Sequence, residues 1–149
     1  MLNGSVRTSV WIALTVQFLG YAFDALWHGL LFPGAEPRTR DEMVRHLAIV
    51  HLPLYLGVVG TLLATARAAV SRQERFTVGP RRVALGGATL SAVGEGWHAI
   101  SHLRMDTHAA PMAGILSVVG FVVVVTAIAV ESRRARTAAA GHPHQRRAA

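Results

Sequence analysis

The stretch VALGGATLSAVGEGWHAISHL, residues 83–103, is apolar for most of its length, yet its last turns carry a glutamate and two histidines. Its length matches the roughly 20 residues that a helix needs to cross a lipid bilayer. Ionisable side chains are costly within a membrane and usually mark a functional site where they occur. The stretch therefore predicts a transmembrane helix in which Glu95, His98 and His102 have a chemical role.

The composition of the whole chain is typical of a membrane protein. Its 149 residues are 52% hydrophobic and 15% charged, whereas a soluble domain carries about a quarter charged residues. Further apolar stretches lie at residues 10–32, 46–69 and 111–131. We predict an all-α, polytopic membrane protein, with a four-transmembrane-helix up-down bundle as one domain over residues 1–131. Residues 132–149 are predicted to be a disordered, basic cytoplasmic tail.

The basic side chains are all arginine, and their placement predicts the orientation in the membrane. Eleven of the fifteen lie before the first helix, between the second and third, or towards the tail: Arg7, Arg67, Arg72, Arg75, Arg81, Arg82, Arg133, Arg134, Arg136, Arg146 and Arg147. Cytoplasmic segments carry the excess of arginine and lysine. We therefore expect both termini in the cytoplasm of a multi-pass protein, in a bacterial plasma membrane. Anionic lipid explains the basic tail, so no nucleic-acid partner is expected.

The histidines sort to one side of the predicted bundle. The first and third helices end, and the second and fourth begin, near six of them: His28, His46, His51, His98, His102 and His108. Because consecutive helices alternate in direction, all six fall at the non-cytoplasmic face.

Helical phase groups these histidines with carboxylates. Asp24 lies one turn before His28 on the first helix, and Glu95 shares a face with His98 and His102 on the third. On a continuous second helix His46 and His51 would differ in direction by about 140°, and we favour His51 as the inward-facing residue because it lies deeper. The alternative is that Pro53 kinks or breaks this helix near its start, which would turn both histidines inward.

These groups predict a metal site. We expect the metal ligands to be Asp24, His28, His51, Glu95, His98 and His102, with His46 and His108 close by. Glu95 and Asp24 are also the candidate catalytic groups. Imidazole and carboxylate ligands suit iron, copper and zinc, and the absence of cysteine excludes thiolate ligands. The alternative left open is that each acid simply pairs with a neighbouring histidine and no metal binds.

A faint internal repeat accompanies the site. The first helix ends with DALWHGL and the third with EGWHAI, and the second and fourth helices begin with HLP and HAAP. Two pseudo-repeated helical hairpins would explain both matches, as in membrane folds built from parallel repeats.

Three functions fit the predicted site. The favoured one is an iron- or copper-dependent oxidoreductase that acts on a lipid or small apolar substrate, with a redox partner as a further expectation. Over five residues, Asp24-x-x-x-His28 resembles the helix-borne ligands in the third subunit of copper membrane monooxygenases. The second is a membrane zinc hydrolase that uses His98 and His102 with His28 or His51; His98-x-x-x-His102 is similar to the closing motif of adiponectin-receptor and ceramidase-type proteins. The third is a non-enzymatic protein that binds b-haem or transfers metal.

Overall fold

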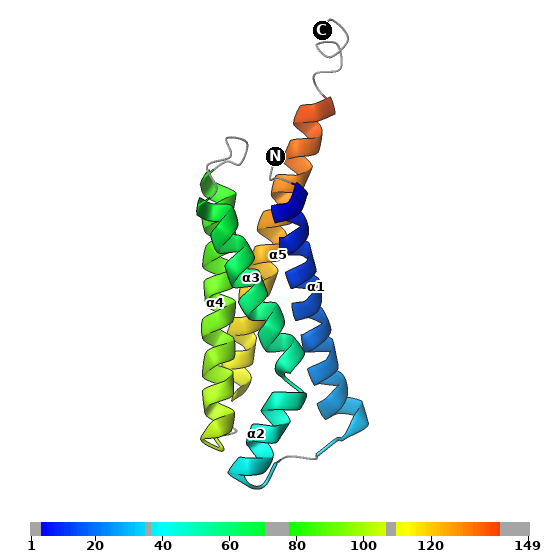
Figure 1. Cartoon of the computed structure of the whole chain (residues 1–149), viewed down its shortest axis with the longest axis vertical. Helices are drawn as coiled ribbons and strands as arrows, with labels where there is room; N and C mark the ends of the chain where they lie inside the picture. Colours follow the sequence, from blue (N-terminus) through cyan, green and yellow to red (C-terminus); the bar gives the residue numbers. More distant parts are fainter. Residues whose placement is uncertain (1–3, 35–36, 71–77, 107–109, 141–149) are drawn as a thin grey trace, which may run out of the picture.

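A computed structural model describes residues 4–34, 37–70, 78–106 and 110–140. Within these ranges the chain is helical, which confirms the all-α prediction (Figure 1). The elements are α1 (Gly4–Leu26), a π-helical turn (Trp27–Leu31), α2 (Arg40–Ile49), α3 (Leu52–Val70), α4 (Val78–Leu103) and α5 (Ala110–Ala140).

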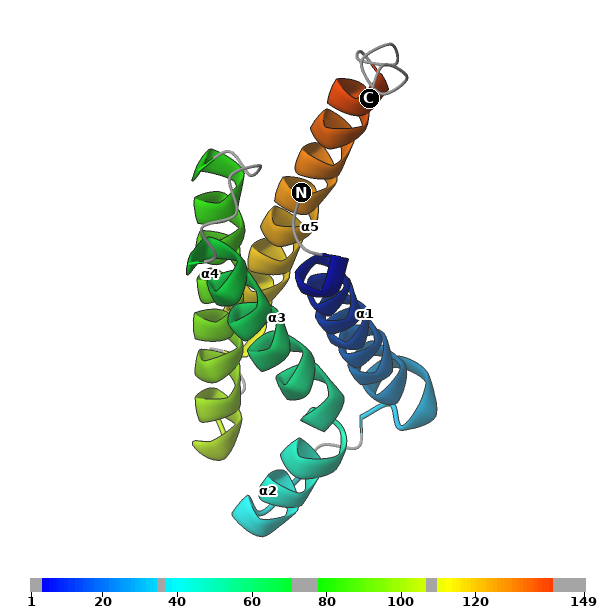
Figure 2. The ribbon, with the colours of Figure 1, turned by 45° about the horizontal axis from the view of Figure 1, so that its top comes forward.

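Four long helices lie beside one another, and the short helix α2 lies below α3 at one end of them (Figures 1 and 2). α1 packs mainly on α3, and α4 mainly on α5, while α3 joins the two pairs through α4. The end of α1, the start of α3, the end of α4 and the start of α5 therefore share one end of the molecule with α2. The two pairs are the predicted hairpins, whereas their origin as an internal repeat stays a prediction.

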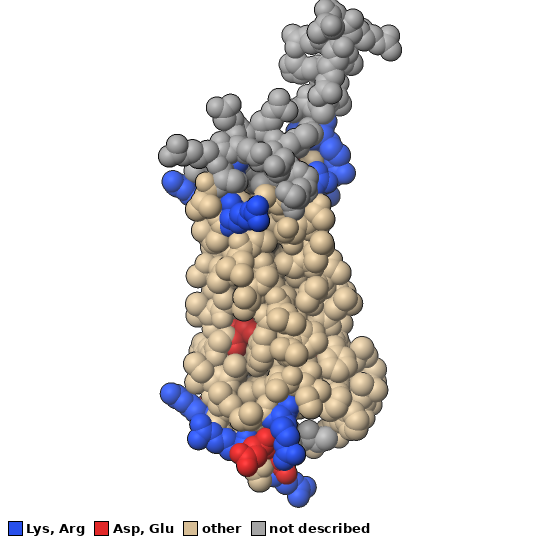
Figure 3. Space-filling model, in the orientation of Figure 1, with Lys and Arg blue, Asp and Glu red and all other residues tan. Residues whose placement is uncertain are grey.

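Three of the described helical segments are long and apolar enough to cross a membrane: Val6–Leu31, Leu52–Val70 and Pro111–Arg134. α4 has 26 residues, which is sufficient length, but its glycines, two arginines and ionisable final turns lower its hydropathy. Many large apolar side chains are exposed on the outside of the described helices. Arginines lie at both ends of the molecule with a mostly uncharged band between them, a distribution that is typical of integral membrane proteins (Figure 3).

The predicted helix over residues 46–69 is interrupted near Pro53, where the sequence predicts a kink. α2 ends at Ile49 and α3 begins at Leu52. Pro53 explains the break, because its ring would clash with the carbonyl of Ile49 four residues earlier and it has no N–H to donate. α2 begins earlier than predicted because Thr39 and Glu42 form a reciprocal capping box at its first turn.

Close backbone approaches hold each hairpin together. A Cβ added at Gly57 of α3 would clash with the backbone of Gln17 on α1, and one at Gly120 of α5 would clash with the backbone of Ser91 on α4. Small residues allow such approaches between membrane helices, where packing replaces the hydrophobic effect as the source of association. At the far end α5 continues to Ala140, beyond residue 131 where the predicted helix ends, and residues 141–149 of the predicted tail lie outside the described part of the chain.

Buried hydrogen bonds fix the two hairpins relative to each other. The Gln17 side-chain amide donates to the Ser91 hydroxyl at 2.8 Å and to the Tyr21 hydroxyl at 3.1 Å. Tyr21 in turn bonds to the hydroxyl of Ser117 on α5 at 2.7 Å. This network joins α1, α4 and α5 one to two turns above the carboxylates Asp24 and Glu95, so it positions the helix ends that carry the histidines.

Candidate metal centre

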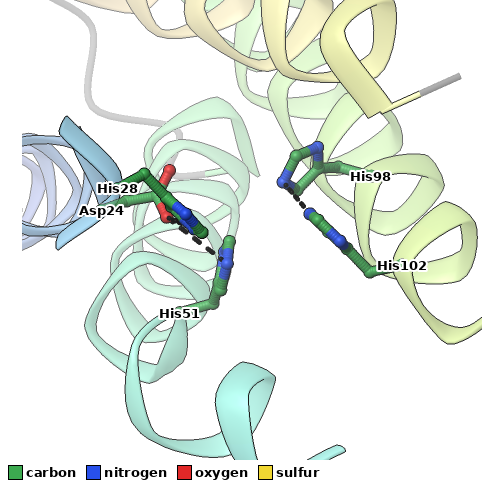
Figure 4. A network of polar contacts seen from close by, with 5 residues as sticks. All are labelled: Asp24, His28, His51, His98 and His102. Carbon is green, nitrogen blue, oxygen red and sulfur yellow. Dashed lines mark hydrogen bonds and ion pairs between the residues drawn. The ribbon is translucent and has the colours of Figure 1, made fainter. Parts of the chain in front are cut away.

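Five histidines converge from separate elements at the α2 end of the bundle. His28 lies in the π-helical turn that follows α1, His46 on α2, and His51 in the break before α3. His98 and His102 lie one turn apart on α4, and both point towards His51 (Figure 4). His108 belongs to residues 107–109, which lie outside the described part of the chain.

The helix break brings both histidines of the second apolar stretch inward. The ring centroids of His46 and His51 are 5.3 Å apart, and that of His46 is 5.1 Å from His28. Both histidines therefore face the site, and the preference for His51 over His46 does not hold, because α2 and α3 are separate helices with different directions. α2 also lies outside the candidate spans, and burial lowers the pKa of His46. The neutral imidazole that this favours is the form that binds metal.

Two overlapping groups of three histidines could each hold a metal ion. His28, His46 and His51 form one group, and His51, His98 and His102 form the other. Within each group the ring nitrogens that could serve as ligands all lie within 4.8 Å of one another. His51 is the member common to both groups, and its ring centroid is 5.5 Å from each of the rings of His98 and His102.

His51 is fully buried, with 0% of its surface exposed. Neither of its ring nitrogens has a hydrogen-bond partner among the described residues. Its Nε2 atom is 3.4 Å from Oδ1 of Asp24, which is longer than an N–H···O hydrogen bond. Buried polar groups in proteins are nearly always hydrogen-bonded or bound to an ion, so this imidazole is an exception that needs a partner.

The carboxylate of Asp24 lies between His28 and His51. Its Oδ1 atom is 3.5 Å from Nε2 of His28 and 3.4 Å from Nε2 of His51. On the opposite side, Nε2 of His98 and Nε2 of His102 are 3.0 Å apart. A contact this short between two imidazole nitrogens requires one of them to donate a hydrogen bond and the other to accept it.

Glu95 belongs to neither group of three histidines. Its side chain is 3% exposed and accepts a hydrogen bond from the Ser117 hydroxyl. The second carboxyl oxygen, Oε1, has no hydrogen-bond partner among the described residues. Of the predicted ligands, Asp24, His28, His46, His51, His98 and His102 thus come together, while Glu95 stands next to them and belongs to neither group of three.

A cavity of about 360 Å³ adjoins the histidines. Its lining includes Asp24, His28, His46, His98 and His102, so ring atoms from both groups border the same space. His51 closes the site on the buried side, where Tyr55 stacks on it with the ring centroids 5.9 Å apart.

Sequence reasoning missed one feature of this site. The π-helical turn at Trp27–Leu31 has no sequence signal, although such turns are common at functional sites. Tyr55 follows His51 by one helical turn, and this spacing already predicts that the two side chains share a face. Comparison of the chain with protein-family models, with curated proteins and with solved structures finds no match. The function is therefore inferred from the site itself.

Proposed function

We propose that this protein is an integral membrane metalloenzyme whose histidines bind a redox-active metal ion at the non-cytoplasmic face. The observation that carries the proposal is His51, which is fully buried, has no hydrogen-bond partner for either ring nitrogen among the described residues, and belongs to both groups of three histidines. Leaving a buried polar group without a partner costs about 1–3 kcal/mol. A metal ion bound by His51 and two neighbouring imidazoles would offset that cost.

The proposed orientation places the metal site outside the cytoplasm. The described arginines at the end opposite the histidines are Arg7, Arg67, Arg81, Arg82, Arg133, Arg134 and Arg136, and those near the histidines are Arg38, Arg40, Arg45 and Arg104. The positive-inside rule then assigns the more basic end to the cytoplasm. In this arrangement α4 is the fourth spanning helix, and its glutamate and histidines face the bundle interior.

The residues around the site suit an iron- or copper-dependent oxidoreductase. Three histidines in each group leave coordination positions open, and such a metal would supply electron transfer to or from a substrate bound beside it. Asp24, within 3.5 Å of His28 and His51, orients these rings and can accept a proton. The cavity of about 360 Å³ offers space for a small apolar substrate or part of a lipid.

A zinc hydrolase is the second candidate, and the group His51, His98 and His102 favours it. Three histidines with an open fourth position are a common catalytic zinc site, in which the bound water has a pKa of about 7. Glu95, one turn before His98, would then serve as the base. A b-haem is less well supported, because the rings of each group contact one another and leave no flat slot between two of them.

The test is the metal content of the full-length protein purified in detergent, with an optical spectrum of the same sample. We expect stoichiometric iron or copper, which a variant with Leu in place of His51 should lose. Stoichiometric zinc would favour the hydrolase, and a haem spectrum would favour electron transfer. Wild-type protein that contains no stoichiometric metal, even after reconstitution with each of these ions, would overturn the proposal.

A further inference from the structure

Two methionines line the cavity together with the histidines. Met43 lies on α2 and is buried, with 4% of its surface exposed, while Met105 follows the last turn of α4. The chain has four methionines in all. Met112 is 58% exposed and does not line the cavity, and Met1 lies outside the described residues.

The two methionines are paired with histidines at the same spacing. Met43 precedes His46 by three residues, and Met105 follows His102 by three residues. Met43 and His46 share a face of α2, because side chains three residues apart on a helix lie on the same side, whereas Met105 is brought back towards His102 by the turn that ends α4. All four side chains border the same cavity. Each pair also joins a different histidine group, because His46 belongs to one group and His102 to the other.

Met105 has an unusual backbone conformation for a residue with a side chain. Its φ is +57°, in the left-handed region that favours glycine. The N–H of Asp106 bonds to the carbonyl of Ser101 and the N–H of Met105 to that of His102, so Met105 occupies the position of a Schellman motif where glycine is usual. Filling a core gap is the ordinary role of methionine, but Met105 is 40% exposed and strained, so packing does not account for it.

We propose that the cavity binds the cuprous ion, Cu(I), with the thioethers of Met43 and Met105 as ligands beside His46 and His102. Soft thioether ligands select Cu(I), whereas iron and zinc sites in proteins are built from harder donors or thiolates. The inference rests on the proposed metal function and names its metal. His51, which belongs to both histidine groups, lies on the buried side of this cavity. An ion bound at the methionines would therefore be adjacent to the imidazoles of both groups.

The test compares metal preferences of full-length variants in detergent. Cu(I) affinity is measured under reducing conditions against a chromophoric Cu(I) chelator, with Ag(I) as a redox-inert substitute and Zn(II) as the hard-donor comparison. Replacing both Met43 and Met105 with Leu keeps the size and apolar character of the side chains. We expect this variant to lose at least about tenfold in affinity for Cu(I) and Ag(I), a loss of the size seen when single supporting groups are removed from metal sites. Zn(II) binding should stay as in wild type. Met112→Leu is the matched control and should change none of these affinities.

A Met105→Gly variant separates ligand loss from damage to the fold. Glycine relieves the left-handed strain, so this variant should melt at a higher temperature than wild type while binding Cu(I) more weakly. Unchanged Cu(I) affinity in the double Leu variant, with metal binding still dependent on His51, would refute the thioether ligands and leave the metal centre standing. An equal loss of Zn(II) and Cu(I) would refute the selectivity. If wild type bound none of the three ions, both this inference and the proposed function would fail.

Discussion

Replacing His51 with leucine tests the central residue of the metal centre, because metal-free and metal-bound protein should respond in opposite directions. His51 is fully buried, and neither of its ring nitrogens has a hydrogen-bond partner among the described residues. Leucine is close to histidine in size and has no polar atom to desolvate. In metal-free protein the substitution therefore removes a buried, unsatisfied group and leaves the packing filled.

The size of the effect follows from these contacts. Removing one unsatisfied buried polar group is worth about 1–3 kcal/mol in the free energy of unfolding. Part of this gain is lost, since Asp24 gives up its 3.4 Å approach to His51 and keeps only His28 at 3.5 Å. We expect metal-free His51→Leu to be more stable than metal-free wild type by roughly 1 kcal/mol. With metal at 100 times its dissociation constant, wild type should gain about 2.7 kcal/mol and His51→Leu should gain nothing, which reverses the order.

The assay is unfolding of the detergent-purified proteins by heat or denaturant, first with chelator and then with the metal found in wild type. His28→Leu is the matched control: His28 has 37% of its side chain exposed and belongs to one group only, so His51, His98 and His102 remain complete. The control should keep most of the metal-dependent stabilisation. The reasoning is refuted if His51→Leu keeps that stabilisation, or if its metal-free form is clearly less stable than wild type.

Three other predictions concern orientation, packing and pH. A cysteine at Gly34 should react with an impermeant thiol reagent in intact cells and one at Thr77 should not; the reverse pattern would invert the proposed orientation. Gly57→Leu should lower the melting temperature through a loss of about 1–3 kcal/mol from overpacking, whereas Gly86→Ala, where an added Cβ meets nothing within 4 Å, should be neutral or slightly stabilising. Backbone N–H groups lower the pKa of Glu42 at the start of α2. Its contribution to the helix is thus present above the ordinary pKa and lost as pH falls through the lowered one. Amide exchange in α2 should accelerate over that acidic range in wild type and show no such step in Glu42→Gln.

The sequence alone determined the helical class, the two hairpins and the end of the molecule at which the histidines gather. These conclusions need only the length of the apolar stretches and the alternating direction of consecutive spanning helices. Because the directions alternate, the ends of the first and third stretches lie at the same side as the starts of the second and fourth, and all four of these positions carry histidines. The pair His98 with His102 was also predictable, because both residues lie within α4, where residues four apart share a face. Asp24 and His28 also lie close together as predicted, although the π-helical turn begins between them.

Only the tertiary structure decided how the two sides of the site meet. On an unbroken helix His46 and His51 point apart, and Pro53 in the sequence predicts a kink without deciding whether both histidines turn inward. The structure shows that the helix breaks there and that both do. The π-helical turn at His28 has no sequence signal at all. His51 belongs to both histidine groups because of how the four long helices pack. Met105 reaches the cavity because it has a left-handed backbone conformation at the end of α4. Neither of these two features follows from local sequence. The distances across the bundle are set where a glycine of one helix contacts the backbone of a residue far away in the sequence, as Gly57 does with Gln17 and Gly120 with Ser91.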